Sequence, residues 1–468
     1  MSSADEAKRG FEYRTILGVW INDISSRPRM EQWPSIEIDA QLERDFAAFF
    51  DTMKEIGLDS IVLCGLFASG SWAPGFRDSV SPEREQAVRR ILAEAATRQI
   101  KVLYGLGLYS WGFDEIIRSN PHVRGTNPRA MCGSKEASHK IMEELIAYLA
   151  SEFPFAGFHF ESADLGRCEC DTCCAKSKSQ YHLELNERMA KYVRSNWPDM
   201  IIKVYCPIGR GTRDDWAIWE EPSKHFTFMI DDVSRANRFG CYSRREIISK
   251  LGCAYGTRSG TWIYPPQRWD RLRWFVPILE KRALHYRKLI EDGGRAVAIQ
   301  GAPLANPAEE ATIRLSARMA ADPSLDVQAV LVEVMEQMFR PRSRVVAEEL
   351  ADIFWSAEKA YWCSTNFQPE GSELLLEPLL GKVAGPPIYL QTRMYVHNIE
   401  EYRYEIGNIK KRVLKIQQDV GDKAGCQSVV TCLDSVLRDL DKIKADGSML
   451  KYPGSTTGPD SWTEEFLW

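Results

Sequence analysis

The chain alternates between two patterns of hydrophobic and polar positions from residue 14 to about 306. Short apolar runs rich in β-branched residues are typical of buried strands. The segments between them repeat apolar residues at three- and four-residue spacing, which is typical of amphipathic helices. The segment DAQLERDFAAFFDTMKEIG (39–57) shows the helical pattern and ends in glycine, a common helix terminator. The predicted strands cover 15–23, 60–67, 101–109, 156–162, 201–208, 225–233, 260–266 and 296–304.

This alternation of strands and helices predicts an α/β protein with a parallel sheet. Eight strand–helix units within about 290 residues match a closed (β/α)8 TIM barrel better than an open doubly wound sheet. No GxGxxG or GxxxxGKS motif follows any predicted strand, so a nucleotide-binding sheet is disfavoured.

The pattern changes to helices alone after residue 306. We therefore expect a barrel catalytic domain over 1–306 and an all-helical C-terminal domain over 307–468. The helical domain is expected to clamp the barrel, and it offers a surface through which a homo-oligomer could form. Its predicted helices cover 309–322, 327–339, 344–362, 395–420 and 428–446.

The composition of the chain argues against a nucleic acid partner, a membrane span and a signal peptide. The net charge of the 468-residue chain is only −5, so there is no basic excess to neutralise the phosphates of a nucleic acid. No run of about 18 apolar residues appears, so no membrane span is expected. The polar N-terminus, MSSADEAKRG, lacks the apolar run of a signal peptide, which favours a cytoplasmic protein.

Carboxylates at the ends of predicted strands are the candidates for catalysis, because a TIM barrel has its active site at the carboxyl ends of its strands. His159 and Glu161 differ by two positions and should share a face of their strand. Asp231 and Asp232 follow the apolar run TFMI, and alternation turns one of them inward, although the sequence does not fix which. Two facing carboxyl groups are the minimum for glycoside hydrolysis. We expect Glu161 to be the general acid, Asp231 or Asp232 to be the base or stabiliser, and Asp164 and His159 to tune Glu161.

Aromatic and polar residues near the other strand ends are candidates for binding a sugar. Aromatic rings stack on sugars, and an arginine can bind a carboxylated sugar through two hydrogen bonds. The motifs HExxH and GxSxG are absent, and no lysine suited to a Schiff base stands at a strand end. The segment 260–266 lacks a glutamate at its end, which disfavours retaining barrel glycosidases that use a nucleophile there. The candidate substrate-binding residues are His159, Asn22, Asp23, Tyr109, Trp111, Arg258, Trp262, Tyr264 and Gln300.

A cysteine cluster, CxCxxCC, follows the fourth predicted strand. Cys168, Cys170 and Cys173 could begin a tetrahedral zinc site, and Cys132 is the nearest candidate for a fourth ligand. Free thiols and a local disulfide are the alternatives. Zinc held by four thiolates has no open position, so this would be a structural metal, and no cofactor is expected for catalysis.

Two segments carry a resemblance to a known group of proteins. FHFESADLGRCECDTCCAKS and NPRAMCGS (127–134) resemble uncharacterised barrel proteins related to α-glucuronidases and to β-N-acetylhexosaminidases. The resemblance, which spans residues 14–306, implies that Glu161 is the general acid and that Asp231 or Asp232 is the base. Hexosaminidases place adjacent aspartate and glutamate at the end of the fourth strand, whereas Glu161 is followed by Ser162.

The sequence therefore predicts a glycoside hydrolase that acts on a short oligosaccharide or glycoside, with a uronic acid or an N-acetylated sugar among its substrates. A small carbohydrate is its expected partner. Two alternatives remain open. One is a metal-dependent sugar isomerase or lyase that uses His159, Glu161, Asp231 and Asp232 as ligands, and the other is a sugar-binding barrel without catalysis.

Overall fold

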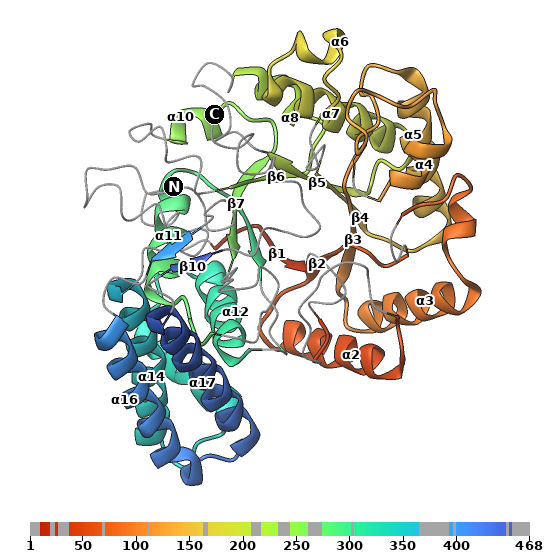
Figure 1. The fold of residues 1–468 in the computed structure, drawn as a ribbon. Helices are drawn as coiled ribbons and strands as arrows, with labels where there is room; N and C mark the ends of the chain where they lie inside the picture. The colour runs from red at the N-terminus through yellow and green to blue at the C-terminus, as the bar shows by residue number, and fades with distance from the viewer. Residues whose placement is uncertain are drawn as a thin grey trace.

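The fold is a closed barrel of parallel strands in the order β1 to β8, surrounded by helices (Figure 1), which confirms the predicted (β/α)8 barrel. A computed structural model describes residues 10–18, 24–26, 37–67, 71–110, 112–161, 167–206, 217–232, 244–260, 274–300, 304, 306–364, 393–395, 399–445 and 449–451. The barrel strands are β1 (Tyr13–Gly18), β2 (Ser60–Leu63), β3 (Lys101–Leu106), β4 (Gly157–Phe160), β5 (Ile201–Cys206), β6 (Phe228–Asp232), β7 (Ala254–Gly260) and β8 (Ala296–Gln300).

The helices of the barrel lie between the strands in sequence and outside them in space (Figure 1). Their apolar faces pack on the outer side of the sheet, as in the predicted helix 39–57, whose core is a run of buried phenylalanines in α2. The described helices up to β8 are α2 (Ala40–Glu55), α3 (Pro82–Thr97), α4 (Asp114–Ser119), α5 (Glu136–Glu152), α6 (Asp171–Cys174), α7 (Lys178–Asn196), α8 (Glu220–Ser223), α10 (Arg244–Ile248) and α11 (Glu280–Glu291), with a 3₁₀ turn, η2, at Phe76–Ser79.

The predicted position of the seventh strand, 260–266, is wrong. The strand lies earlier, at Ala254–Gly260, and pairs with β6 and β8. The sequence pattern does not indicate this strand, because its alanine and glycine residues have low strand propensity. Packing requires glycine at one of these positions: a Cβ on Gly256 would lie 2.0 Å from the carbonyl oxygen of Ala296. Arg258 therefore lies within a barrel strand and not in the segment that leads into one.

The interior of the barrel is separate from the layer between strands and helices. Its apolar part is a cluster of inward-facing side chains, and Tyr13 extends this cluster by stacking on Phe228, with ring centroids 4.8 Å apart. Side chains that alternate with these pack outward against the helices. The inward cluster consists of Leu17, Val62, Cys64, Leu103, Phe228, Ile230, Ala254, Ala296 and Ala298.

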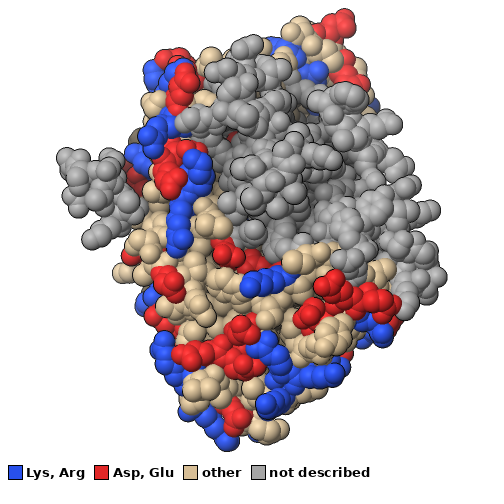
Figure 2. Space-filling model, turned by 90° about the vertical axis from the view of Figure 1, so that its left-hand side faces the viewer, with Lys and Arg blue, Asp and Glu red and all other residues tan. Residues whose placement is uncertain are grey.

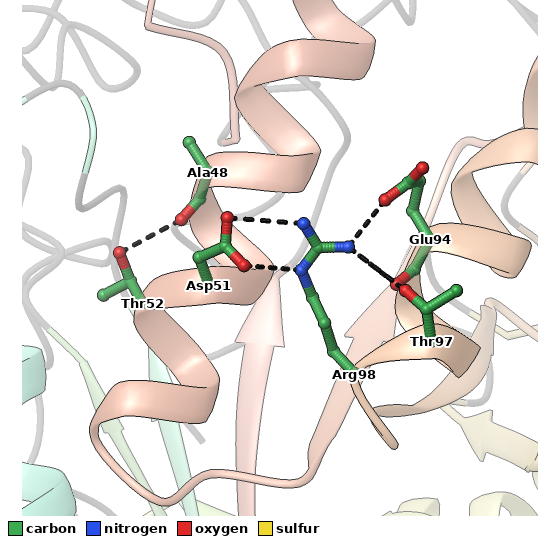
Figure 3. A network of polar contacts seen from close by, with 6 residues as sticks. All are labelled: Ala48, Asp51, Thr52, Glu94, Thr97 and Arg98. Atoms are coloured by element: carbon green, nitrogen blue, oxygen red, sulfur yellow. Dashed lines mark hydrogen bonds and ion pairs between the residues drawn. The ribbon is translucent and has the colours of Figure 1, made fainter.

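Ion pairs join neighbouring helices on the outside of the barrel. Arg98, at the end of α3, donates to Asp51 on α2 over 2.7 Å and to Glu94 on its own helix over 2.6 Å (Figure 3). The guanidinium holds the pKa of Asp51 below its ordinary value. Because exposed pairs of this kind contribute at most about 1 kcal/mol each, this network orients α2 against α3 without dominating stability.

The C-terminal helices form the predicted helical layer on one side of the barrel (Figure 1). Helix α12 packs on β8 and α11, and also on α13 and α17, so it belongs to the ring around the barrel as well as to this layer. The division at residue 306 stays a prediction. The helices are α12 (Pro307–Ala321), α13 (Val327–Phe339), α14 (Arg344–Ser364), α16 (Ile399–Ile416) and α17 (Lys423–Ala445). The segment is not all-helical as predicted, because β9 (Arg393–Tyr395) and β10 (Met449–Lys451) pair as a short antiparallel sheet.

Buried carboxylates of the helical layer hold the segment that leads into α11. Glu358 of α14 accepts hydrogen bonds from the backbone N–H groups of Leu279, at 2.9 Å, and Glu280, at 3.1 Å. A carboxylate is favourable there because the first N–H groups of a helix have no partners within the helix. Asp439 of α17 accepts a 2.8 Å hydrogen bond from the indole of Trp274. The layer therefore fixes the start of α11 to the helices that follow the barrel.

Charges of both signs are mixed on the described part of one face of the molecule (Figure 2). Figure 2 shows Lys and Arg interspersed with Asp and Glu on one face of the molecule, in line with the small net charge. Among the residues that the structure describes, no helix is both long enough and apolar enough to cross a membrane.

Candidate active site at the carboxyl ends of β4 to β7

Glu161 stands immediately after β4, at the carboxyl end of the barrel. Two hydrogen bonds fix its backbone to the end of β3 and the residues after it. The N–H of Glu161 donates to the carbonyl oxygen of Leu106 over 3.1 Å, and its carbonyl oxygen accepts from the N–H of Leu108 over 3.0 Å. The side chain is 16% exposed, whereas that of His159 below it is 3% exposed. Glu161 is therefore a carboxyl group held at the boundary between the polar barrel interior and solvent.

His159 shares the inward face of β4 with Glu161. Its Nε2 lies 3.7 Å from Glu161 Oε2. Burial, with Lys203 and Arg258 nearby, lowers the pKa of His159 well below its ordinary value. The imidazole is therefore neutral at pH 7, and it contacts Glu161 as a polar neighbour and not as a cation.

Two cationic side chains lie deeper in the same region. Lys203 of β5 pairs in register with His159 and is fully buried. Burial lowers its pKa to about 7, while Glu161 acts to raise it. Arg258 of β7 is also buried, and its guanidinium carbon lies 5.2 Å from the centre of the Tyr205 ring.

The structure separates the two aspartates of β6. Asp231 is fully buried, and its Oδ2 accepts a 2.9 Å hydrogen bond from the hydroxyl of Tyr255. Tyr255 belongs to the outer core between strands and helices, so Asp231 lies on the outer face of the sheet. Position 232 falls in the inward series with Phe228 and Ile230 and pairs in register with Arg258. We therefore leave Asp231 out of the site and retain position 232.

The side chain of Tyr109 belongs to the core outside the barrel and not to this region. It adopts a positive φ of 67°, is fully buried, and has its hydroxyl oxygen 2.6 Å from Nδ1 of His139 on α5. Its ring packs between the barrel and α5, so it offers no stacking surface in this arrangement. Gln300 and Asp232 are described for their backbone alone. Outside the described residues lie Asn22, Asp23, Trp111, Asp164, Trp262 and Tyr264.

Lys203 is the functional candidate that sequence reasoning missed. A signal was present: in IIKVYC, a lysine stands between apolar residues on both sides, in a strand of a barrel whose two faces are both covered. Such a lysine has no solvent-facing side to occupy, so it must lie in the outer core or in the barrel interior.

The four cysteines predicted as zinc ligands come together in space. The sulfur atoms of Cys132, Cys168, Cys170 and Cys173 all lie within 4.8 Å of one another. Cys132 Sγ is 3.8 Å from the sulfurs of both Cys170 and Cys173. All four are free thiols, which excludes the local disulfide for these residues in this structure.

This geometry fits a metal ion. A tetrahedral site with metal–sulfur bonds of about 2.3 Å has sulfur–sulfur edges of about 3.8 Å. The backbone N–H of Cys173 lowers the pKa of Cys170 to about 6, as suits a thiolate ligand. The loops after β3 and β4 supply the four thiols, and Gly125 leaves room for one of them, because a Cβ there would lie 2.5 Å from Cys168 Sγ. These four cysteines can therefore hold a metal that joins the two loops.

No family model and no curated protein matches the sequence. A solved structure of a mutant O-GlcNAc hydrolase from Thermobaculum terrenum is similar to this chain, with a TM-score of 0.52 and 10% sequence identity over 93% of this chain and 83% of that one. The structure of CpGH84B aligns with a TM-score of 0.47 and 9% identity over 98% of this chain and 72% of that one. The likeness to the first protein shows a shared fold.

Proposed function

We propose that this protein is a glycoside hydrolase with Glu161 as its general acid. The observation that carries the proposal is the position of Glu161: it is a partly exposed carboxyl group at the carboxyl end of β4, above a buried polar interior. Carboxyl groups in such surroundings exchange protons with substrates, and this end of a TIM barrel is where catalysis takes place.

The second carboxyl group in the proposal is Asp232, with the role of base or stabiliser. Its backbone lies two strands from Glu161 in the barrel, at the same end, opposite Arg258 in the register. One carboxyl group would protonate the leaving oxygen while the other activates water or stabilises the positive charge on the sugar. The solved relative is named as an O-GlcNAc hydrolase, so an N-acetylglucosaminide belongs in the first set of substrates tested, beside a uronide.

The metal-dependent isomerase or lyase is less well supported. It requires Asp231 to coordinate together with His159 and Glu161, but Asp231 is on the outer face of β6 and bound by Tyr255. A sugar-binding barrel without catalysis remains an outcome that the experiment below can detect.

The test is hydrolysis of a panel of 4-nitrophenyl glycosides that includes neutral, N-acetylated and uronic acid sugars. The wild type should hydrolyse at least one of them, and Glu161→Gln should lose at least about a hundredfold in kcat on substrates that need a proton. Glu12→Gln is the matched control, because Glu12 lies exposed beside β1 at the opposite end of the strand. Binding of a sugar with no turnover in the wild type would overturn the proposal in favour of a binding protein.

We also propose that Cys132, Cys168, Cys170 and Cys173 hold one structural zinc ion. The support is the set of sulfur–sulfur distances and the closed, four-thiolate donor set, which leaves no position for substrate. Elemental analysis of the purified protein should find about one zinc per chain. Cys170→Ser should lose it, whereas Cys174→Ser, at an exposed neighbouring cysteine outside the cluster, should keep it. Equal zinc content in both variants would contradict the assignment.

A further inference from the structure

Lys203 is an ionisable side chain buried inside the barrel, where burying a charge lowers the stability of the fold. It is the third residue of β5, with no exposed surface, and its Nζ has no hydrogen-bond partner among the described groups. A buried ammonium that makes no hydrogen bond destabilises the fold, and a hydrophobic side chain of similar size would avoid that cost. Burial of this kind next to a specific charge partner is typical of a functional site.

The groups around Lys203 come from several strands. Cys64, immediately after β2, Glu161, immediately after β4, and Arg258 of β7 all act on it electrostatically. His159 of β4 is beside it in the register and neutral, and Phe228 of β6 is beside it on the other side. Among these neighbours, all of them described residues, Glu161 carries the carboxyl group.

The structure also supplies the space for this arrangement. Gly105 of β3 pairs in register with His159, and a Cβ there would lie 2.1 Å from Cys64 Sγ. Because this position is glycine, the sulfur of Cys64 has room in the barrel interior beside β3. The interior below Glu161 is therefore built from polar side chains, whereas the remaining inward positions are mostly apolar.

We infer that Lys203 is a positioning residue that acts on Glu161 through its charge: its ammonium group, beside His159 inside the barrel, stabilises the carboxylate form of Glu161. The inference rests on the proposed function for its catalytic consequence. When Glu161 gives its proton to the leaving oxygen, it becomes an anion in a region of low dielectric. A cation nearby stabilises that anion, and this makes Glu161 a stronger acid.

The decisive measurement needs no substrate. The full-length protein is labelled with ¹³C at the glutamate side-chain carboxyl carbons, and Glu161 is identified as the signal missing from Glu161→Gln. In Lys203→Met, the titration midpoint of Glu161 should move to a pH higher by about one unit or more, because the stabilising cation is gone. Lys203→Arg, which keeps the charge, should shift it less, and Lys101→Met, which removes an exposed lysine of β3, should not shift it at all. An unchanged midpoint in Lys203→Met overturns the inference, and Lys203→Gln serves as the second variant if the methionine protein does not fold.

Kinetics then separates this inference from the proposed function. On a glycoside that the wild type hydrolyses, Lys203→Met should lower kcat several-fold with KM unchanged, and the alkaline limb of its pH profile should move in the same direction as the Glu161 midpoint. An equal loss at every pH, with no movement of that limb, indicates a merely structural role and overturns the inference. If no glycoside is hydrolysed but the Glu161 midpoint still shifts, the charge coupling is supported and the proposed function fails.

Discussion

Replacing Lys203 with methionine should change how the stability of the protein depends on pH. The pKa of Lys203 is about 7 in the folded protein, against an ordinary value of 10.5. Between these two pH values the unfolded chain binds a proton at this lysine that the folded protein does not. The free energy of unfolding of the wild type therefore rises with pH across this window, and the lysine contributes this rise because its folded pKa is depressed.

The size of the effect follows from the two pKa values. Between pH 7 and pH 9, linkage gives a gain of about 2 kcal/mol in the wild type that the methionine variant lacks. For a chain of 468 residues, the entropy of unfolding is about 1 kcal/mol per kelvin, so this corresponds to about 2 °C in Tm.

The assay is thermal unfolding of wild type and Lys203→Met at pH 7, 8 and 9, with Lys101→Met as the control for loss of an exposed lysine. The quantity of interest is the difference in Tm between wild type and variant. Other titrating groups contribute equally to the two proteins, and the effect of the change in packing is the same at each pH. The variant should be the more stable protein at pH 7, and the difference should shift by about 2 °C in favour of the wild type at pH 9. Parallel curves over this range would refute the assignment of a buried lysine with a depressed pKa.

Three other substitutions or treatments test separate parts of the structure. Asp231→Asn should lower the free energy of unfolding by about 1–3 kcal/mol by weakening its buried bond from Tyr255, while sparing hydrolysis per folded molecule; selective loss of kcat without loss of stability would return Asp231 to the site. Glu358→Gln should destabilise by about 1–2 kcal/mol, because the start of α11 loses a charged acceptor, and an unchanged Tm would mean that the helical layer does not fix this segment. Removing metal with a chelator should lower Tm and increase proteolysis in the loops after β3 and β4, and a chelator-treated protein with native Tm and no metal would contradict a structural zinc.

The barrel could be predicted from the sequence because each of its units has a clear period. Helix 39–57 has a continuous apolar face, and strands such as 201–208 have β-branched residues on both faces. The apolar pattern predicts the seventh strand at 260–266, later than its true position at Ala254–Gly260, because the glycines and the alanine of the strand give no such signal. Gly256 is there because of the close approach of Ala296, which is a contact between strands that no local pattern encodes.

Part of the candidate site could also be predicted from the sequence, because strand ends and the loops after them meet at one end of a barrel. The position of Glu161 follows from the end of a buried run, and Cys132 joins the other cysteines because the loops after two adjacent strands meet at the same end of a barrel. The choice between Asp231 and Asp232 depends on the register of β6, which apolar residues on both faces of a barrel strand leave undetermined. Lys203 was overlooked because lysine is ordinarily read as a surface residue.

The proposed function requires above all that Glu161 act as an acid toward the leaving group. The measurement that tests this is kcat for Glu161→Gln and wild type on two glycosides of the same sugar, one with a 2,4-dinitrophenyl leaving group and one with an alkyl leaving group. A dinitrophenolate leaves without a proton, so we predict that the variant keeps most of its activity on the first substrate and loses at least about a hundredfold on the second. Equal losses on both substrates, or no loss on either, would contradict the role assigned to Glu161.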